Sequence, residues 1–268
     1  MKIIRYQDRT GKIGYACEQP DGSALTITGD LFGEFEVTRE KAQVNKLLAP
    51  VVPSTIWCIG LNYRHHAVEA GVAIPEYPII FAKSSSALQN PGDPIQIPTH
   101  LKSDEVDFEC ELPVVIGKRC KNVRRDHALH YVLGYTCAND VSARDWQLKK
   151  GGSQWCRGKT FDTFAPLGPC LITKEEIPDP HTLRIQTTLN GASMQDWNTS
   201  DMIFDIPTLI EFLSGSTTLL AGTVILTGTQ HGVGFARNPP LWLKPMDKVS
   251  IIIDKIGTLT NPVENEPG

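Results

Sequence analysis

The chain has 268 residues, and 41% of them are hydrophobic, which is enough for the core of one large domain or of a medium domain with an appendage. Its 26 Lys and Arg residues stand against 30 Asp and Glu residues, and a net charge of −4 gives no electrostatic footprint for nucleic acid or for an anionic membrane surface. The apolar stretches are far shorter than the roughly 20 residues of a membrane-spanning helix, and the charged N-terminus indicates no signal peptide.

Cysteine usage points to a reducing compartment. The chain has 7 cysteines, an odd number, and none of them forms a Cys-x-x-Cys pair. This pattern favours reduced, buried thiols over a disulfide framework or a zinc site. We therefore expect a cytoplasmic protein.

The first 52 residues differ from the rest of the chain. Short strand-like segments at 2–6, 14–18 and 25–28 are separated by Gly, Asp and Pro turns. Residues 39–48 have the pattern of a short helix, and prolines follow at 50 and 53. We expect residues 1–52 to form a small β-rich N-terminal domain without chemistry of its own, and residues 53–268 to form the main domain.

Short runs rich in Val, Ile and Thr alternate with Pro and Gly turns from residue 55 onward. The runs lie at 56–59, 79–81, 95–97, 112–117, 183–189, 224–226 and 249–253. Helical patterns are few, at 66–70, 126–130 and 206–214. The predicted fold class is mostly β with short helices, a mixed α+β arrangement.

The segment from 105 to 117 carries three acidic residues at alternate positions. In a strand, Asp107, Glu109 and Glu111 would project from one face. A solvated outer face is one interpretation. However, the segment continues into apolar residues 114–116, which indicates that the strand enters the core. Carboxylates that face inward need a cation, and an all-oxygen site suits Mg²⁺, Ca²⁺ or Mn²⁺.

A further acidic residue, Asp140, ends an apolar run and precedes a predicted turn or short helix at 142–147. A carboxylate at the end of a core strand is well placed to complete a metal site. An Asp in this position also often caps a helix. Both interpretations stay open from the residues alone.

A histidine and a glutamate share one face of the helix expected at 66–70. His66 and Glu69 lie at i and i+3, so their side chains can hydrogen-bond. A carboxylate beside an imidazole fixes its tautomer, as a general base requires. The alternative is an exposed polar pair on a surface helix.

Two loops complete the set of candidate segments. Residues 157–166 place Lys159 between a glycine and aromatic residues, and residues 226–234 form a Thr- and Gly-rich loop whose N–H groups can hold an anion. The second loop lacks the Gly-Lys-Ser/Thr ending of a phosphate-binding loop, so nucleotide binding is weakly supported.

Taken together, these segments resemble the fumarylacetoacetate hydrolase family, from about residue 53 to residue 263. The resemblance rests on Gly60-Leu61-Asn62-Tyr63 with His66 and Glu69, Asp107-Phe108-Glu109-Cys110-Glu111-Leu112, Asn139-Asp140-Val141-Ser142-Ala143-Arg144-Asp145, Gly158-Lys159-Thr160-Phe161-Asp162, and Thr227-Gly228-Thr229 with Gly232-Val233-Gly234. It implies a rolled β-sheet catalytic domain at 53–268, a small β-rich N-terminal appendage, and a homodimer. One departure is Gln230-His231, where many members have a proline.

The resemblance also assigns roles to individual residues. Ligands of a divalent cation, Mg²⁺ with Mn²⁺ or Ca²⁺ as alternatives, would be Glu109, Glu111 and Asp140, with Asp107 as an indirect or water-mediated partner. The catalytic residues would be His66 and Glu69 on a lid, together with Lys159. The substrate would be bound by Arg144, Gln147, Gly228 and Thr229.

The implied reaction is the cleavage of a C–C bond in a 2-oxo or 1,3-dicarbonyl acid, such as an acylpyruvate or a fumarylacetoacetate-like compound, by hydrolysis through an enolate stabilised by the metal. Alternatives at the same site are decarboxylation of oxaloacetate and isomerisation of a 2-hydroxyhepta-2,4-diene-1,7-dioate-type diacid. A non-enzymatic alternative is a structural Ca²⁺-binding module. We expect the loops at 70–77 and 149–155 to shape the pocket.

Overall fold

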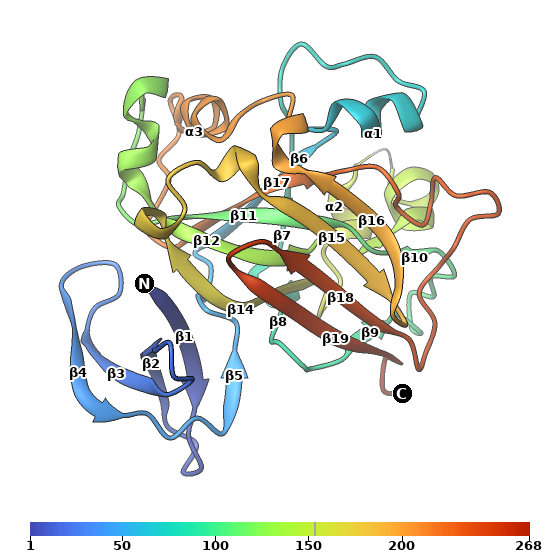
Figure 1. Cartoon of the computed structure of the whole chain (residues 1–268). Helices are drawn as coiled ribbons and strands as arrows, with labels where there is room; N and C mark the ends of the chain where they lie inside the picture. Colours follow the sequence, from blue (N-terminus) through green and yellow to red (C-terminus); the bar gives the residue numbers. More distant parts are fainter. Residues whose placement is uncertain (153) are drawn as a thin grey trace.

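The computed structural model describes residues 1–152 and 154–268 of the chain, and strands dominate it (Figure 1). The strands are β1 (Lys2–Gln7), β2 (Ile13–Glu18), β3 (Ala24–Gly29), β4 (Phe35–Lys41), β5 (Lys46–Leu48), β6 (Thr55–Gly60), β7 (Ile79–Lys83), β8 (Leu88–Gln89), β9 (Ile95–Ile97), β10 (Val106–Asp107), β11 (Cys110–Ile116), β12 (Val132–Asn139), β13 (Ser142–Ala143), β14 (Ala165–Thr173), β15 (Arg184–Leu189), β16 (Ala192–Asn198), β17 (Thr223–Thr229), β18 (Lys248–Ile253) and β19 (Gly257–Asn265). The α-helices are α1 (Arg64–Glu69), α2 (Cys156–Lys159) and α3 (Ile206–Ser214). Short 3₁₀ turns occur at Ser85–Ala87, Arg125–Tyr131, Lys174–Glu176, Pro180–Thr182 and Thr199–Asp201, and a π-helical turn at Trp146–Lys150. The predicted class, mostly β with short helices, is confirmed.

Two sheets form the main body of the molecule. The larger sheet has the strand order β4-β3-β2-β1-β14-β12-β11-β17-β6-β7, with β5 on β1 and β8 on β14. The second sheet has the order β16-β15-β18-β19-β9 and lies across the first; in Figure 1, β15 and β16 are gold to orange and β18 and β19 are red. Strands β11, β14 and β17 are buried almost throughout, since they lie at the centre of the larger sheet.

Alternation in the sequence explains the second sheet. In β18, Val249, Ile251 and Ile253 are buried, while the residues between them are more accessible. A period of two places these side chains on one face, and burying that face against the larger sheet provides the hydrophobic driving force for packing. The core therefore lies between the two sheets.

Helix α3 spans the segment predicted at 206–214. Asp205 caps its first turn by accepting a hydrogen bond from the Thr208 N–H at 2.9 Å. The prediction of a helix at 39–48 is wrong, because this segment forms parts of β4 and β5. Pairing of β5 with β1 satisfies the backbone there, and this long-range contact overrides the local pattern.

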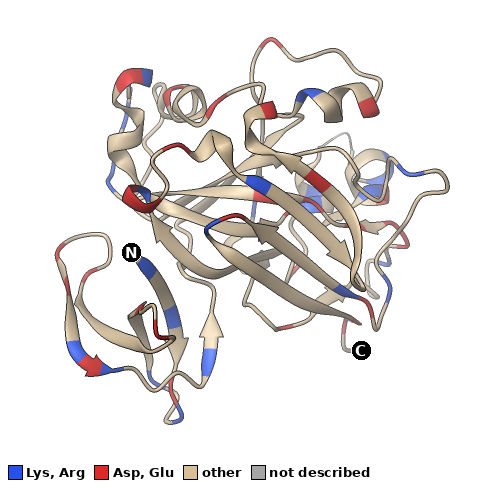
Figure 2. Cartoon of the chain, in the orientation of Figure 1, with Lys and Arg blue, Asp and Glu red and all other residues tan. Residues whose placement is uncertain are grey.

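Strands β1–β5 occupy one corner of the molecule, at the lower left of Figure 1. Strand β1 continues the larger sheet through its antiparallel pairing with β14, at Lys2↔Ile172 and Ile3↔Leu171. A boundary between two domains near residue 52 stays a proposal. Acidic and basic residues are interspersed along the ribbon (Figure 2). In the part of the chain that the structure describes, no helix is long and apolar enough to cross a membrane.

Candidate functional site

Pairing among three central strands brings the acidic residues together. Cys110 of β11 pairs with Asn139 of β12, and the N–H of Asp140 donates to the carbonyl of Glu109 at 2.9 Å. On the other side of β11, Glu111 pairs with Thr229 of β17. As a result, one carboxylate oxygen from each of Glu109, Glu111 and Asp140 lies within 4.8 Å of the others, and all three residues are buried.

Three buried cations surround this carboxylate cluster. Lys159 Nζ lies 2.7 Å from Glu109 Oε2 and 2.9 Å from Asp140 Oδ2. Arg144 Nη2 donates to Glu109 Oε1 at 2.6 Å, and Lys83 Nζ lies 2.6 Å from Asp140 Oδ1. Burial alone would raise the pKa of Glu109, but the charges of Lys159 and Arg144 outweigh it and hold that pKa well below its usual range.

Glu111 lies in a less neutralised environment. Its Oε2 accepts a hydrogen bond from the Gly228 N–H at 2.7 Å. Burial, followed by repulsion from Asp140 and Glu109, raises the pKa of Glu111 well above its usual value. The cluster is therefore short of positive charge. Its donor set is all oxygen, so it fits a hard divalent cation of the Mg²⁺ type.

Asp107 does not extend the carboxylate cluster. The expected continuous strand is interrupted at Phe108 and Glu109, between β10 and β11. Asp107 Oδ1 accepts from the N–H groups of Phe108 (2.8 Å) and Gly234 (2.7 Å), and Oδ2 accepts from the Phe235 N–H (3.0 Å) and Arg144 Nε (2.9 Å). The Asp107 carboxylate therefore fixes the position of the Arg144 side chain and of the loop that follows β17.

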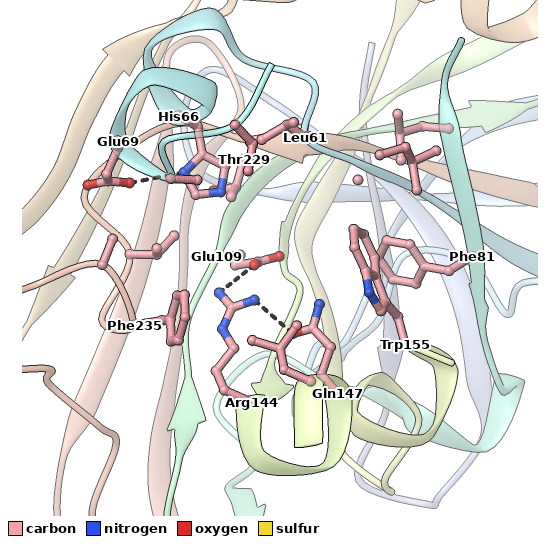
Figure 3. A pocket seen from close by; sticks show the side chains of 18 of the residues that line it. Leu61, His66, Glu69, Phe81, Glu109, Arg144, Gln147, Trp155, Thr229 and Phe235 are labelled. Carbon is pink, nitrogen blue, oxygen red and sulfur yellow. Dashed lines mark hydrogen bonds and ion pairs between the residues drawn. The ribbon is translucent and has the colours of Figure 1, made fainter. Parts of the chain in front are cut away.

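Arg144 is held by protein acceptors on several sides. Besides Asp107 and Glu109, it donates from Nη1 to Gln147 Oε1 at 2.9 Å (Figure 3). Burial lowers the pKa of Arg144, but the two carboxylates overcome this effect and raise it. The bond fixes the orientation of the Gln147 amide, whose Nε2 has no hydrogen-bond partner among the described residues and is left to meet a ligand.

The His66–Glu69 pair lies on helix α1. His66 Nδ1 is 2.9 Å from Glu69 Oε2, and Glu69 Oε1 accepts from the Gly232 N–H at 2.8 Å. Partial burial raises the pKa of Glu69, but these two hydrogen bonds and the imidazole lower it overall. Both oxygens of Glu69 are thus engaged, whereas Nε2 of His66 has no hydrogen-bond partner in the described part of the chain.

A single cavity of about 520 Å³ joins these groups. Eight of the residues predicted for the site line it: His66, Glu69, Glu109, Glu111, Arg144, Gln147, Lys159 and Thr229. Figure 3 shows Glu109 and Arg144 at its centre, with the His66–Glu69 pair above them. Ala70, Val72, Ala73 and Pro75 of the loop at 70–77 line it, as does Trp155 of the loop at 149–155, in which residue 153 lies outside the described residues.

Two predicted substrate-binding residues, Gly228 and Thr229, form hydrogen bonds within the protein. The Gly228 N–H donates to Glu111, and Gly228 does not line the cavity; the predicted metal ligand Asp140 does not line it either. The Thr229 hydroxyl donates to the Cys110 carbonyl at 2.9 Å and accepts from Gln195 Nε2 at 2.9 Å. At the departure from the family pattern, Gln230 is buried and its carbonyl accepts from Gln195 at 2.8 Å.

Sequence reasoning missed two buried residues of this region. Lys83 binds Asp140 and also donates to the carbonyls of Val141, Lys159 and Phe164. One sequence feature could have identified it: Lys83 is a single lysine that follows Phe81 by two residues in an apolar run. In a strand, residues two apart lie on the same face, so a buried Phe81 implies a buried Lys83. Gln195 lies in an exposed-looking strand pattern, and nothing in its local sequence marks it.

Comparison with known proteins identifies the family. A family model described as fumarylacetoacetate (FAA) hydrolase C-terminal matches residues 55–264. The chain is 52% identical over 218 residues to the "Oxaloacetate tautomerase fahd2, mitochondrial" of Xenopus laevis, covering 81% of this chain and 68% of the relative. It is 50% identical over 228 residues to the "Fumarylacetoacetate hydrolase domain-containing protein 2 homolog" of Dictyostelium discoideum, covering 82% of this chain and 74% of the relative.

Solved structures agree with this result. The 5-carboxymethyl-2-hydroxymuconate delta-isomerase from Mycobacterium smegmatis superposes with a TM-score of 0.86 at 38% identity, and the fumarylacetoacetate hydrolase from Exiguobacterium antarcticum with 0.89 at 32%. Each covers 99% of this chain and 100% of the matched chain. The resemblance seen in the five motifs is thereby confirmed: the chain belongs to the fumarylacetoacetate hydrolase family of enzymes.

Proposed function

We propose that this enzyme catalyses keto–enol tautomerisation of a 2-oxo acid with an acidic C–H beside the carbonyl, with oxaloacetate as the reference substrate. The observation that carries the proposal is the His66–Glu69 pair, which lines the same cavity as the carboxylate cluster and leaves one imidazole nitrogen without a partner. The name of the Xenopus laevis relative supports the same reaction.

The proton transfer needs one base, and His66 supplies it. With Nδ1–H donating to Glu69, the lone pair lies on Nε2, which takes the proton from the carbon next to the carbonyl. The C–H electron pair forms the C=C bond, and the carbonyl π pair moves to oxygen. Return of the proton to that oxygen gives the enol, and the reverse sequence gives the keto form. No water is consumed.

Neighbouring cations favour a negatively charged oxygen during this step. Lys159 lines the cavity, and the Gln147 amide, oriented by Arg144, can hold the carboxylate of the substrate. A divalent cation held by Glu109, Glu111 and Asp140 would supply Lewis acidity toward the oxo oxygen. We propose Mg²⁺ for this site, with Mn²⁺ and Ca²⁺ as alternatives, since all three prefer oxygen donors.

The local charge supports an anionic substrate. Four buried carboxylates (Asp107, Glu109, Glu111 and Asp140) face three buried cations (Lys83, Arg144 and Lys159). With all four carboxylates ionised, this leaves one net negative charge, and a bound dication, which favours the ionised form of Glu111, would convert it to one net positive charge. A buried site of that sign stabilises a 2-oxo carboxylate.

Hydrolysis or decarboxylation that breaks a C–C bond is the second candidate. The sequence favoured hydrolysis, and the same His66–Glu69 pair could activate water. We rank it second because both oxygens of Glu69 are engaged, by His66 and by Gly232, so this carboxylate is placed to orient the imidazole rather than to bind a water molecule. Since the chain belongs to a family of enzymes, the site is not that of a purely structural Ca²⁺ module.

The test is an assay of freshly dissolved enol-oxaloacetate with the Mg²⁺-loaded enzyme. Absorbance follows loss of the enol, and a separate pyruvate assay detects decarboxylation. We expect faster enol loss without faster pyruvate formation, and no such acceleration in His66→Ala. A parallel assay with acylpyruvates as substrates tests for hydrolysis. Cleavage of acylpyruvates without any effect on the enol would overturn the ranking in favour of hydrolysis.

A homodimer and a cytoplasmic location also stay proposals. The dimer comes from the family resemblance and is tested by sedimentation equilibrium. All seven cysteines are free in the structure, as a reducing compartment requires, although the Xenopus laevis relative is named as mitochondrial. Localisation of the tagged full chain tests the second proposal.

A further inference from the structure

The cavity has a charged end and an apolar end. At the charged end, Glu109, Glu111, Arg144 and Lys159 belong to the carboxylate cluster and its cations, and Glu69 lines the cavity beside His66. Much of the remaining lining is apolar, including Leu61, Val72, Ile79, Phe81, Leu148 and Trp155. Figure 3 shows this division, with Trp155 and Phe81 to the right of the polar groups.

Strand β7 runs from the charged end to the apolar end. Its alternate residues Lys83, Phe81 and Ile79 share one face, about 6–7 Å apart. Lys83 binds Asp140, and the Phe81 ring centroid lies 5.1 Å from Lys159 Nζ. Ile79 lines the cavity and is 36% exposed, so it lies toward solvent. A molecule held at the cluster would therefore extend along Phe81 and then Ile79.

Trp155 completes this surface and is held firmly. Its ring packs edge-on against Phe81, with centroids 5.7 Å apart. It also approaches Gly60 so closely that a Cβ there would lie 2.3 Å from Cζ3 of the indole. The absence of a side chain at residue 60 is thus what lets the indole reach this position. We call Ile79, Phe81 and Trp155 the β7 wall.

Charged partners are missing along the β7 wall. Among the described residues that line the cavity, the Lys and Arg side chains are Lys159 and Arg144, and both are bound to carboxylates at the charged end. A second carboxylate placed against Ile79 or Trp155 would lose its hydration without gaining a partner. Such desolvation disfavours a charged group and favours a hydrocarbon chain.

The volume of the cavity also favours a substrate with an additional chain. A four-carbon oxo diacid has about nine non-hydrogen atoms, which at no more than about 30 Å³ each fill at most about 270 Å³. The cavity measures about 520 Å³, so a compact diacid leaves roughly half of it to water.

We propose that the β7 wall binds an uncharged apolar chain attached to the 2-oxo acid, so the preferred substrates are 2-oxo acids with an apolar tail, and long diacids are disfavoured. This inference rests on the proposed function for the 2-oxo acid head. It differs from what the name of the Mycobacterium smegmatis isomerase says of that enzyme, since 5-carboxymethyl-2-hydroxymuconate carries three carboxylates. Oxaloacetate remains a small substrate that uses the charged end alone.

The test measures binding, so it does not depend on turnover. Oxamate mimics the 2-oxo acid head, and calorimetry with the Mg²⁺-loaded enzyme gives dissociation constants for oxamate, N-propyl oxamate, N-hexyl oxamate and an N-carboxyalkyl oxamate of the hexyl length. Because each buried methylene is worth up to roughly fourfold in affinity, we expect N-hexyl oxamate to bind at least about tenfold more tightly than oxamate. The carboxyl-terminated chain should lose this gain.

A matched pair of variants locates the effect. Ile79→Arg places a cation on the β7 wall and should reverse the order, so that the carboxyl-terminated chain binds more tightly than the hexyl chain. Ile80→Arg is the control, since Ile80 is the next residue of β7, is similarly exposed (39%) and does not line the cavity. It should leave the order unchanged.

The outcomes separate the two proposals. Equal affinity for all the oxamates, or the same reversal in both variants, would overturn the role of the β7 wall and leave the proposed reaction standing. A gain with chain length in an enzyme that tautomerises no 2-oxo acid would support the wall and overturn the reaction. If oxamate and all its derivatives fail to bind, both proposals fall.

Discussion

Replacing Lys83 by methionine tests how the carboxylate cluster is held. The Lys83 side chain is fully buried, lies 2.6 Å from Asp140 Oδ1, and donates to the carbonyls of Val141 (2.9 Å) and Phe164 (2.8 Å). Lys83→Met keeps a long unbranched side chain, one atom shorter than lysine, but leaves Asp140 short of one cation and the carbonyls without this donor. Breaking a buried pair in this way costs about 3–5 kcal/mol.

At about 2–4 °C per kcal/mol for a chain of this size, the melting temperature should fall by about 6–20 °C. Mg²⁺ should bind roughly tenfold more tightly to Lys83→Met, because the competing positive charge beside Asp140 is gone. Differential scanning calorimetry and Mg²⁺ titration measure the two effects.

The matched control is Lys46→Met, whose ion pair with Asp93 is similarly short, at 2.7 Å, but partly exposed. Exposed pairs contribute only about 0–1 kcal/mol, so this variant should melt close to the parent. Similar melting temperatures for the two variants, or an unchanged Mg²⁺ affinity in Lys83→Met, would refute the reasoning.

Three further predictions concern the site. His66→Ala should lower the tautomerisation rate about 10²–10⁴-fold in kinetic assays and leave Mg²⁺ affinity unchanged, since His66 is not among the three clustered carboxylates. Glu109→Gln should weaken Mg²⁺ binding by roughly 100-fold or more in calorimetry and abolish turnover, because it removes one of three charged ligands. Because burial and like charges raise the pKa of Glu111, the metal-free native state binds more protons than the unfolded chain above the usual value of 4.5. Its stability should therefore fall as pH rises through that window, and Mg²⁺ at a hundredfold excess over its Kd should restore about 2.7 kcal/mol.

Each of these predictions has a result that contradicts it. A His66→Ala variant that loses Mg²⁺ affinity would place the imidazole at the metal. Full activity in Glu109→Gln would remove this carboxylate from the site. For the pH dependence, thermal melts in chelator from about pH 5 to about pH 8 that rise or stay level would mean that Glu111 is already neutralised in the native state.

Much of the fold follows from local patterns in the sequence. The alternation of Val249, Ile251 and Ile253 makes a one-sided strand, and the Asp205 cap with the apolar spacing after it makes helix α3. The segment at 39–48 shows the limit of such reasoning. Its helical pattern is weak, and pairing with β1 and β3 decides its structure. Backbone pairing with distant strands cannot be read from a ten-residue window.

The sequence by itself determined which chemical groups are present: acidic residues entering a core, an imidazole with a carboxylate one helical turn away, and the five motifs of the family. Tertiary structure decided which of these groups meet. The register of β11 against β12 and β17 brings Glu109, Glu111 and Asp140 together, while the break before β11 turns Asp107 toward Arg144 and Gly234. The physical reason is that carboxylates two residues apart become ligands of one ion only where strands distant in the chain pair beside them and bury them, and both pairing and burial are properties of the whole fold.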